Sequence, residues 1–142
     1  MTIRPAAITD HNAIYHLNKI GLGYDYPLEK TQQRLTEILQ KPHVKFLVAE
    51  IDGAFAGYIH AADYDTTSSD PMVNVIALVV DDAFRGKGVG RALLTAAENW
   101  AREIGAVGVR LVSSEYRHGA HRFYENCGYT SQKMQKNFKK VF

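Results

Sequence analysis

The stretch "VNVIALVVDDAFRGKGVGRALL" (residues 73–94) joins an apolar run to a glycine-rich turn and then to an amphipathic segment. The run 73–80 is apolar nearly throughout, which predicts a strand covered on both faces. After the turn, apolar residues recur on one stripe from Val89 to Ile104, which predicts a helix closed by Gly105. The glycines and their basic neighbours therefore lie where a strand gives way to a helix.

The glycine-rich turn has the features of an anion-binding site. It contributes three glycines and three basic residues, which are Gly86, Gly88, Gly90, Arg85, Lys87 and Arg91. The first N–H groups of a helix lack internal partners and carry the positive end of its dipole, and glycines let an anion approach them. The spacing matches neither a P-loop nor the dinucleotide-binding fingerprint, in which Leu93 would have to be glycine. A pyrophosphate fits, and a turn whose glycines only relieve backbone strain is the alternative.

The rest of the chain predicts one domain over residues 1–142. Periodicity and turn residues predict further strands at 3–7, 44–51, 54–62, 107–114 and 129–142, and further helices at 14–20, 28–41 and 120–127. Hairpins come first and crossover helices later. This order predicts an α/β fold with a mixed, mostly antiparallel central sheet and helices on both faces.

Composition and charge exclude several classes of protein. The net charge of +2 is too small to indicate nucleic-acid binding, although four lysines fall in the last ten residues and leave 13 basic against 15 acidic residues elsewhere. That basic tail predicts a solvated terminal strand rather than a phosphate contact. The one cysteine, Cys127, excludes an intrachain disulfide and a cysteine-based metal cluster. With no signal-like or membrane-length apolar run, we expect a cytoplasmic protein that binds no membrane.

Two motifs resemble those of the GNAT family of N-acetyltransferases. The segment "VVDDAFRGKGVGRALL" (79–94) is similar to the acetyl-CoA binding pattern R/Q-x-x-G-x-G/A, and the segment "GAHRFYENCGY" (119–129) is similar to A-x-x-F-Y-x-x-x-G-F/Y. The matched positions are Arg85, Gly88, Gly90, Ala120, Phe123, Tyr124, Gly128 and Tyr129. The order of predicted elements resembles the family along nearly the whole chain.

The resemblance implies acetyl-CoA as co-substrate and no metal. The strand at 73–80 would splay from the strand at 107–114, so that main-chain groups of 78–80 bind the pantetheine arm and the acetyl carbonyl. The implied cofactor-binding residues are Leu78, Val79, Val80, Arg85, Gly86, Lys87, Gly88, Val89, Gly90, Arg91 and Arg117. Arg117 stands where relatives often have Asn. A CoA phosphate, an acidic group of the acceptor and solvent remain its alternative partners.

The resemblance also makes Tyr124 the catalytic proton donor to the departing thiolate, with a packed structural ring as the alternative. Many relatives carry a carboxylate base on the strand at 73–80, which has none here. Candidate bases are His60, Asp63, Asp65, Glu115 and His118, and proton loss through water is the alternative. Cys127 lacks a base partner, so direct attack in a ternary complex is expected rather than an acyl-cysteine.

Aromatic and acidic residues gather around the first two predicted helices and the loop 63–71. They are Tyr24, Tyr26, Tyr58, Tyr64, Asp25, Asp63 and Asp65, and such groups suit a cationic amine. Together with the acetyl transfer that the resemblance implies, this predicts as acceptor a primary amine of a small molecule, a lysine or an N-terminus. A catalytically silent acyl-CoA sensor is the alternative, and pairing of the last strand would allow a homodimer.

Overall fold

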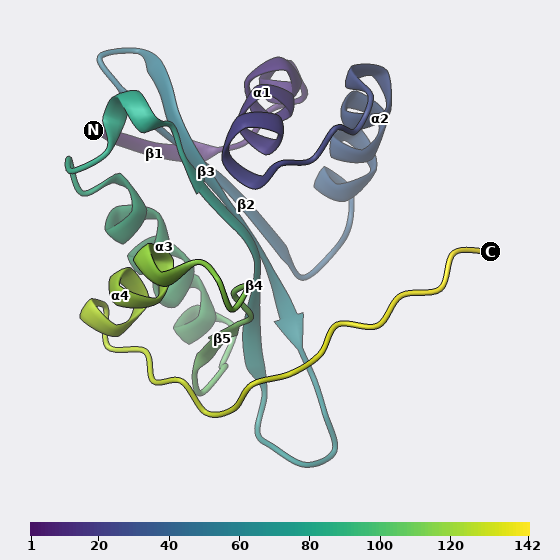
Figure 1. The fold of residues 1–142 in the computed structure, drawn as a ribbon, viewed down its shortest axis with the longest axis vertical. Coiled ribbons are helices and arrows are strands. Elements are labelled where there is room, and N and C mark those ends of the chain that lie inside the picture. Colours follow the sequence, from purple (N-terminus) through teal and green to yellow (C-terminus); the bar gives the residue numbers. More distant parts are fainter. The chain divides into compact units, whose positions relative to one another are not determined.

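The hairpins expected in the first half of the chain form a continuous sheet. In the computed structural model, which describes residues 1–142, five strands lie side by side in chain order (Figure 1). They are β1 (Thr2–Pro5), β2 (Val44–Ile51), β3 (Ala54–Tyr64), β4 (Met72–Val80) and β5 (Val109–Leu111). The pairs from β1 to β4 are antiparallel, and β4 pairs with β5 in parallel. The expected mixed, mostly antiparallel sheet is confirmed.

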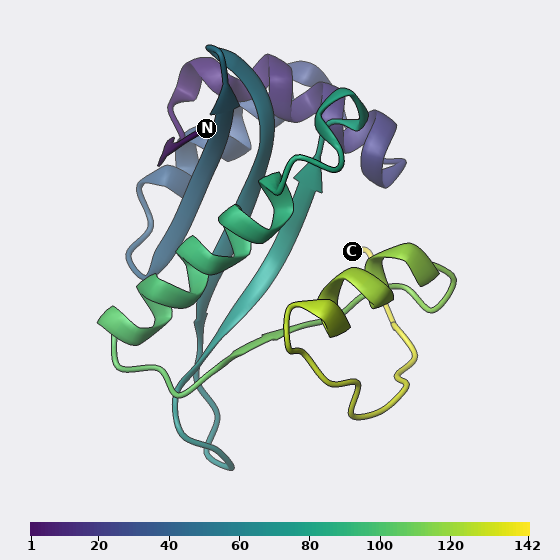
Figure 2. The same cartoon turned by 90° about the vertical axis from the view of Figure 1, so that its left-hand side faces the viewer.

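Three helices cover this sheet. They are α1 (His11–Leu22), α2 (Leu28–Leu39) and α3 (Val89–Glu103), with short 3₁₀ turns at Ile8–Asp10 and Asp82–Phe84. The helices α1 and α2 lie on one face of the sheet and α3 on the other (Figure 2). These elements make up one compact unit, Met1–Leu111.

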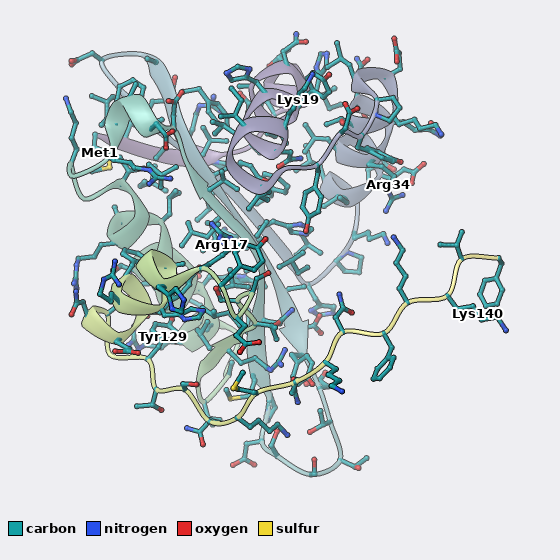
Figure 3. The ribbon with its side chains drawn as sticks, viewed as in Figure 1. Met1, Lys19, Arg34, Arg117, Tyr129 and Lys140 are labelled. Atoms are coloured by element: carbon teal, nitrogen blue, oxygen red, sulfur yellow. The ribbon has the colours of Figure 1, made fainter.

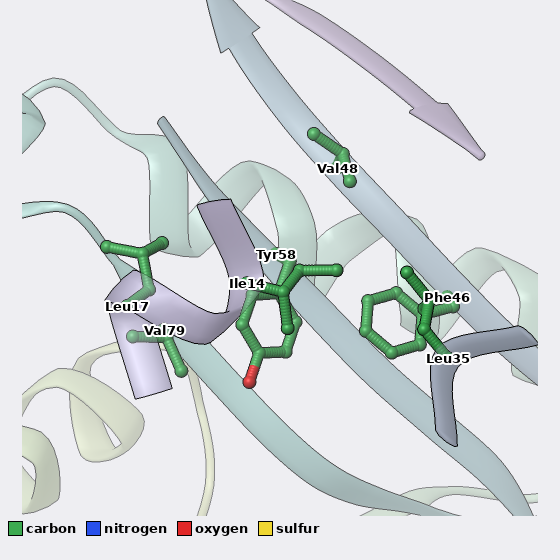
Figure 4. Packing of buried hydrophobic residues seen from close by; sticks show 7 residues of the cluster. All are labelled: Ile14, Leu17, Leu35, Phe46, Val48, Tyr58 and Val79. Carbon is green, nitrogen blue, oxygen red and sulfur yellow. The ribbon is translucent and has the colours of Figure 1, made fainter. Parts of the chain in front are cut away.

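The face under α1 and α2 is built from residues that the strand register brings together. Val48 on β2, Tyr58 on β3 and Val79 on β4 lie opposite one another across the three strands. Phe46 lies on the same face of the sheet, two residues before Val48 on β2. These side chains pack with those of the helices in a buried cluster that comprises Ile14, Leu17, Leu35, Phe46, Val48, Tyr58 and Val79 (Figure 4). Each such side chain contributes about 1.5–3 kcal/mol of burial free energy.

The other face holds the start of α3 close to β3 and β4. Val89, the first residue of α3, is 2% exposed, and Leu93 is fully buried one turn later. Gly57 on β3 makes this approach possible, because a Cβ there would lie 3.3 Å from Val89 Cγ1 and 2.6 Å from the Val79 carbonyl oxygen. The end of β4 and the start of α3 are therefore fixed against the same piece of sheet.

The second compact unit, Val112–Phe142, contains α4 (His118–Asn126) and no strand. The expected strand over 129–142 is wrong. Met134, Phe138 and Phe142 are exposed at 73%, 87% and 108% of their reference areas. Alternation of apolar and polar residues describes a strand's two faces but does not supply the hydrogen-bonded neighbour that a strand needs. The expected strand 107–114 is likewise shorter, at 109–111, and one domain over 1–142 stays a prediction.

Candidate active site

A bulge interrupts β4 near its middle. On β3, His60 pairs with Ala77 and the next residue, Ala61, pairs with Val75, so Ile76 has no partner across the ladder. The Ile76 side chain is 53% exposed, although the sequence predicted a strand covered on both faces. An unpaired extra residue bends a strand and increases its twist.

The partner of β4 on the other side ends at the same level. Val73, Asn74 and Val75 pair with Val109–Leu111, and no strand continues beside the remaining residues of β4. The edge of β4 from Ile76 to Val80 is therefore open on the side where β5 would continue. This is the separation of the two strands that the sequence led us to expect.

The main-chain groups of Leu78 and Val80 face this open edge. The Asp81 N–H donates to Ala56 O at 2.8 Å, which fixes Asp81 as facing β3. Alternate residues of an antiparallel strand direct their N–H and C=O groups to opposite sides. Val79 therefore also faces β3, and its side chain is 5% exposed in the core. Of the three residues expected to bind through the main chain, Leu78 and Val80 are the two that can.

The glycine loop that follows forms a concave row of main-chain N–H groups. Gly86 and Gly88 have φ of 75° and 79°, in the left-handed region, and Lys87 between them does not. Alternation of handedness turns successive N–H groups toward a common point, which is an anion-binding arrangement. No side chain caps α3, and its first turn begins with the Ala92 N–H bond to Gly88 O at 3.0 Å. The N–H groups of Val89 and Gly90 thus remain available.

The entry to this loop is held by two aspartates. Asp81 Oδ1 accepts the Ala83 N–H at 2.9 Å and caps the 3₁₀ turn. Asp82 pairs with Arg85, Oδ1 to Nε at 2.7 Å, and both side chains are more than 70% exposed. So exposed a pair contributes little to stability, about 0–1 kcal/mol, and Arg85 can exchange this partner for another anion. The sequence interpretation missed the pairing, which an acidic residue three positions before Arg85 could have indicated.

In the second unit, Tyr124 lies on α4 among aromatic rings. Its centroid is 5.2 Å from that of Phe123 and 6.1 Å from that of Tyr129, both edge to face. Burial raises the pKa of the Tyr124 phenol above its ordinary value, against the opposing effect of Arg117. The phenol therefore stays protonated at neutral pH. Arg117 is the N-cap residue of α4, and its N–H donates to Ser114 O at 3.0 Å.

The candidate bases belong to different elements of the two units. Asp63 pairs with Val73, five residues from Leu78, which corresponds to about 16 Å along β4. Asp65 lies beyond the end of β3, while Glu115 and His118 are exposed residues of the second unit. His60 lies opposite Ala77 and stacks on Phe46 at 5.0 Å. Burial lowers the pKa of His60 to about 4, so its imidazole is neutral at physiological pH.

An open hollow of about 480 Å³ lies beside α1 and α2. Its wall is formed by Asn18, Tyr24, Asp25, Tyr26 and Arg34. Three of these were expected in an acceptor pocket, whereas the sequence interpretation missed Asn18 and Arg34. Tyr58 approaches it from β3 by donating its hydroxyl to Asn18 Oδ1, and burial raises the pKa of that phenol.

The other acceptor candidates lie elsewhere. The Tyr64 ring stacks under the Arg110 guanidinium at 4.3 Å, and Arg110 also donates to Asn74 Oδ1 at 2.6 Å. Asp63 and Asp65 follow the same end of β3. The structure therefore separates the tyrosine and aspartate cluster expected from the sequence into two places.

No three histidine, cysteine or carboxylate side chains come close enough together to hold a metal ion. Nor does any helix combine the length and the apolar character that crossing a membrane requires.

Comparison with known proteins identifies the family. The sequence profile of the acetyltransferase (GNAT) family matches residues 11–129. An aminoglycoside N(6')-acetyltransferase type 1 of Stenotrophomonas maltophilia is 34% identical over 140 residues, which cover 90% of this chain and 85% of that protein. The chain belongs to the GNAT acetyltransferase family.

Other GNAT proteins agree in sequence and in fold. An N-alpha-acetyltransferase of Sulfurisphaera tokodaii is 27% identical over 144 residues, covering 96% of this chain and 84% of the relative. The crystal structure of an aminoglycoside N-acetyltransferase in complex with CoA superposes with a TM-score of 0.87 at 23% identity, covering 98% of this chain and 93% of that one. GNAT membership thus supports an acetyltransferase, and the expected fold is confirmed.

Proposed function

We propose that the protein transfers the acetyl group of acetyl-CoA to a primary amine by direct attack in a ternary complex. One observation carries this proposal. The open edge at the end of β4 is followed along the chain, after one short turn, by the uncapped N–H groups at the start of α3. A thioester arm ending in a pyrophosphate needs both, in that order.

The main chain is proposed to bind the donor. The N–H groups of Val89 and Gly90, with those of the glycine turn before them, hold the pyrophosphate, and Arg85, Lys87 and Arg91 add positive charge. The N–H and C=O groups of Leu78 and Val80 bond the pantetheine amides and the acetyl carbonyl oxygen. A main-chain N–H aimed at that oxygen stabilises the negative charge that develops when the carbonyl is attacked.

The transfer then needs protons to leave the nitrogen and one to reach the sulfur. The ammonium first loses a proton, the neutral amine attacks the acetyl carbon, and the tetrahedral intermediate then loses a second nitrogen proton as the carbon–sulfur bond breaks and the thiolate takes up a proton. We assign the proton that the thiolate takes up to the Tyr124 hydroxyl, which stays protonated at neutral pH and regains its proton from the second one that the nitrogen releases. The first proton leaves through water, because the lowered pKa of His60, about 4, makes its imidazole a weak base.

The acceptor is proposed to enter through the hollow beside α1 and α2. Aromatic faces and the carboxylate of Asp25 attract an ammonium group. The names of the two relatives, an aminoglycoside N(6')-acetyltransferase and an N-alpha-acetyltransferase, support an amino group as the acceptor.

Two measurements test the proposal. Acetyl-CoA should raise the midpoint of thermal unfolding in proportion to its affinity, whereas ATP and NAD should not. Thiol release should then be measured with acetyl-CoA and a panel of primary amines. Turnover on any amine supports the enzyme, and stabilisation by acetyl-CoA without turnover would instead indicate the acyl-CoA sensor. If acetyl-CoA does not stabilise the protein, the proposed donor site is wrong.

A further inference from the structure

The hollow beside α1 and α2 carries an unexpected pair of opposite charges. Asp25 and Arg34 both line its wall. A site for a simple amine or for a polycation needs acidic and aromatic groups only, because a guanidinium repels an ammonium ion. The presence of Arg34 therefore indicates a more specific ligand.

Arg34 forms an ion pair with Glu37 that leaves most of its N–H donors free for a ligand. It projects from α2 (Figure 3), and its Nη1 donates to the Glu37 carboxylate one turn along the helix. A guanidinium has five N–H donors in a planar fork, so most of them stay available. The side chain is 47% exposed, which leaves it open to a ligand. Such a fork suits a carboxylate or phosphonate, which it can bind through two parallel hydrogen bonds.

Other residues of the wall supply complementary groups. Gly23 ends α1 in the left-handed region, and the Tyr24 N–H returns to Asn18 O at 3.0 Å, which sets the course of the chain into Asp25. Because Asn18 Oδ1 accepts the Tyr58 hydroxyl, the amide group of Asn18 keeps its N–H donors for a ligand. Tyr58, which reaches Asn18 on the wall of the hollow, pairs with Val79 near the end of β4.

We propose that this hollow selects acceptors that carry an anionic oxygen group in addition to the primary amine, with Arg34 as the specificity-determining residue. Asp25 and the tyrosine rings attract the ammonium, and Arg34 binds the carboxylate or phosphonate. The inference rests on the proposed acetyl transfer, since it names the substrate class of that reaction.

The experiment compares amines that differ only in the anionic group. Initial rates of thiol release are measured with 4-aminobutyrate against n-butylamine, with 3-aminopropylphosphonate against n-propylamine, and with spermidine as a polycation. We expect kcat/KM to favour the anionic member of each pair by about tenfold, mainly through KM. Arg34→Gln should abolish that preference by raising KM for 4-aminobutyrate and 3-aminopropylphosphonate but not for n-butylamine and n-propylamine, whose KM should fall slightly as the repulsion is removed, whereas Asp25→Asn should raise KM for every amine.

A matched variant separates recognition from helix stability. Glu37→Gln breaks the same ion pair as Arg34→Gln but keeps the guanidinium, so it should keep the preference, and Arg34→Lys should keep only part of it. The proposal is overturned if the wild type prefers n-butylamine or spermidine, or if the Arg34→Gln and Glu37→Gln variants behave alike.

Failure of the proposed function gives a different result. In that case no amine is acetylated, while 4-aminobutyrate binding can still be measured by calorimetry on the wild type and on Arg34→Gln. Binding that depends on Arg34 would then uphold the anionic subsite, and equal or absent binding in both would reject it.

Discussion

The glycine loop 85–91 and the hollow beside α1 and α2 recognise their proposed ligands by different means. The loop presents main-chain N–H groups, shaped by the left-handed φ of Gly86 and Gly88. The hollow presents side chains, with Asp25 and Arg34 of opposite charge on its wall. Main-chain recognition depends on chain geometry and tolerates exchange of neighbouring side chains. Side-chain recognition can change with a single substitution.

The largest effect should come from the side chain that we propose as a participant in the chemistry rather than in binding. Tyr124→Phe removes one hydroxyl and keeps the ring contacts with Phe123 and Tyr129. If the Tyr124 hydroxyl protonates the thiolate as proposed, we expect kcat to fall about 100-fold with acetyl-CoA affinity unchanged. Single-turnover thiol release measures this. Tyr116→Phe, at a side chain 78% exposed in the same unit, should be neutral, and equal rates for both variants would return Tyr124 to a packing role.

The next largest effect should be on the pH dependence of stability, through His60 in the central sheet. The pKa of His60 is lowered to about 4, so below pH 6.5 the unfolded chain takes up a proton that the folded one does not. Stability should therefore fall as pH drops from 6.5 to 4, by about 2 kcal/mol after allowance for partial exposure. Urea unfolding at several pH values checks this. His60→Phe should flatten the dependence of the free energy of unfolding on pH, whereas His16→Gln, at an exposed position, should leave it as in the wild type. If the free energy of His60→Phe still falls as steeply with pH, the buried imidazole is not the cause of the fall.

A matched pair of glycines isolates main-chain recognition. Gly88 and Gly105, at φ of 79° and 82°, flank α3, and a Cβ at either one would meet no atom within 4 Å. Alanine at each should cost a similar free energy of unfolding, about 1–2 kcal/mol from the left-handed φ alone. Only Gly88→Ala should weaken acetyl-CoA binding, by about tenfold, as measured by calorimetry. Equal affinities in the two variants would mean that the loop does not bind the donor.

The smallest effect should come from the mobile charges of the loop. Lys87→Gln removes one exposed charge and is expected to raise the Kd of acetyl-CoA about threefold at low salt, with the difference fading near 0.5 M salt. The tenfold effect of Gly88→Ala should persist there. If the Lys87 variant proves the weaker binder of the two, side chains rather than N–H groups dominate the loop.

The sequence was sufficient for the loop because its determinants are local. Glycines between an apolar strand and an amphipathic helix predict the turn, which is confirmed, whereas the anion that its basic residues suggest stays a prediction. The hollow depended on tertiary structure, because Asn18 and Arg34 come from different helices and meet only after both have packed. The prediction of a last strand was wrong for a similar reason. Residues 129–142 alternate between apolar and polar side chains as a strand does, but no local pattern specifies the neighbouring strand that it would need.

The unpaired Ile76 also changes the phase of β4. Before Ile76, the odd-numbered residues Val73 and Val75 lie on the face under α3. After it, the even-numbered residues Leu78 and Val80 lie on that face. Deleting Ile76 would give a regular ladder with the same partners on β3, so Leu78 and Val80 would still face the open edge and only the local bend and extra twist would be lost. Apart from Ile76, the apolar residues of "VNVIALVV" lie either under α3 or against the cluster under α1 and α2, and this explains why the strand is so uniformly apolar.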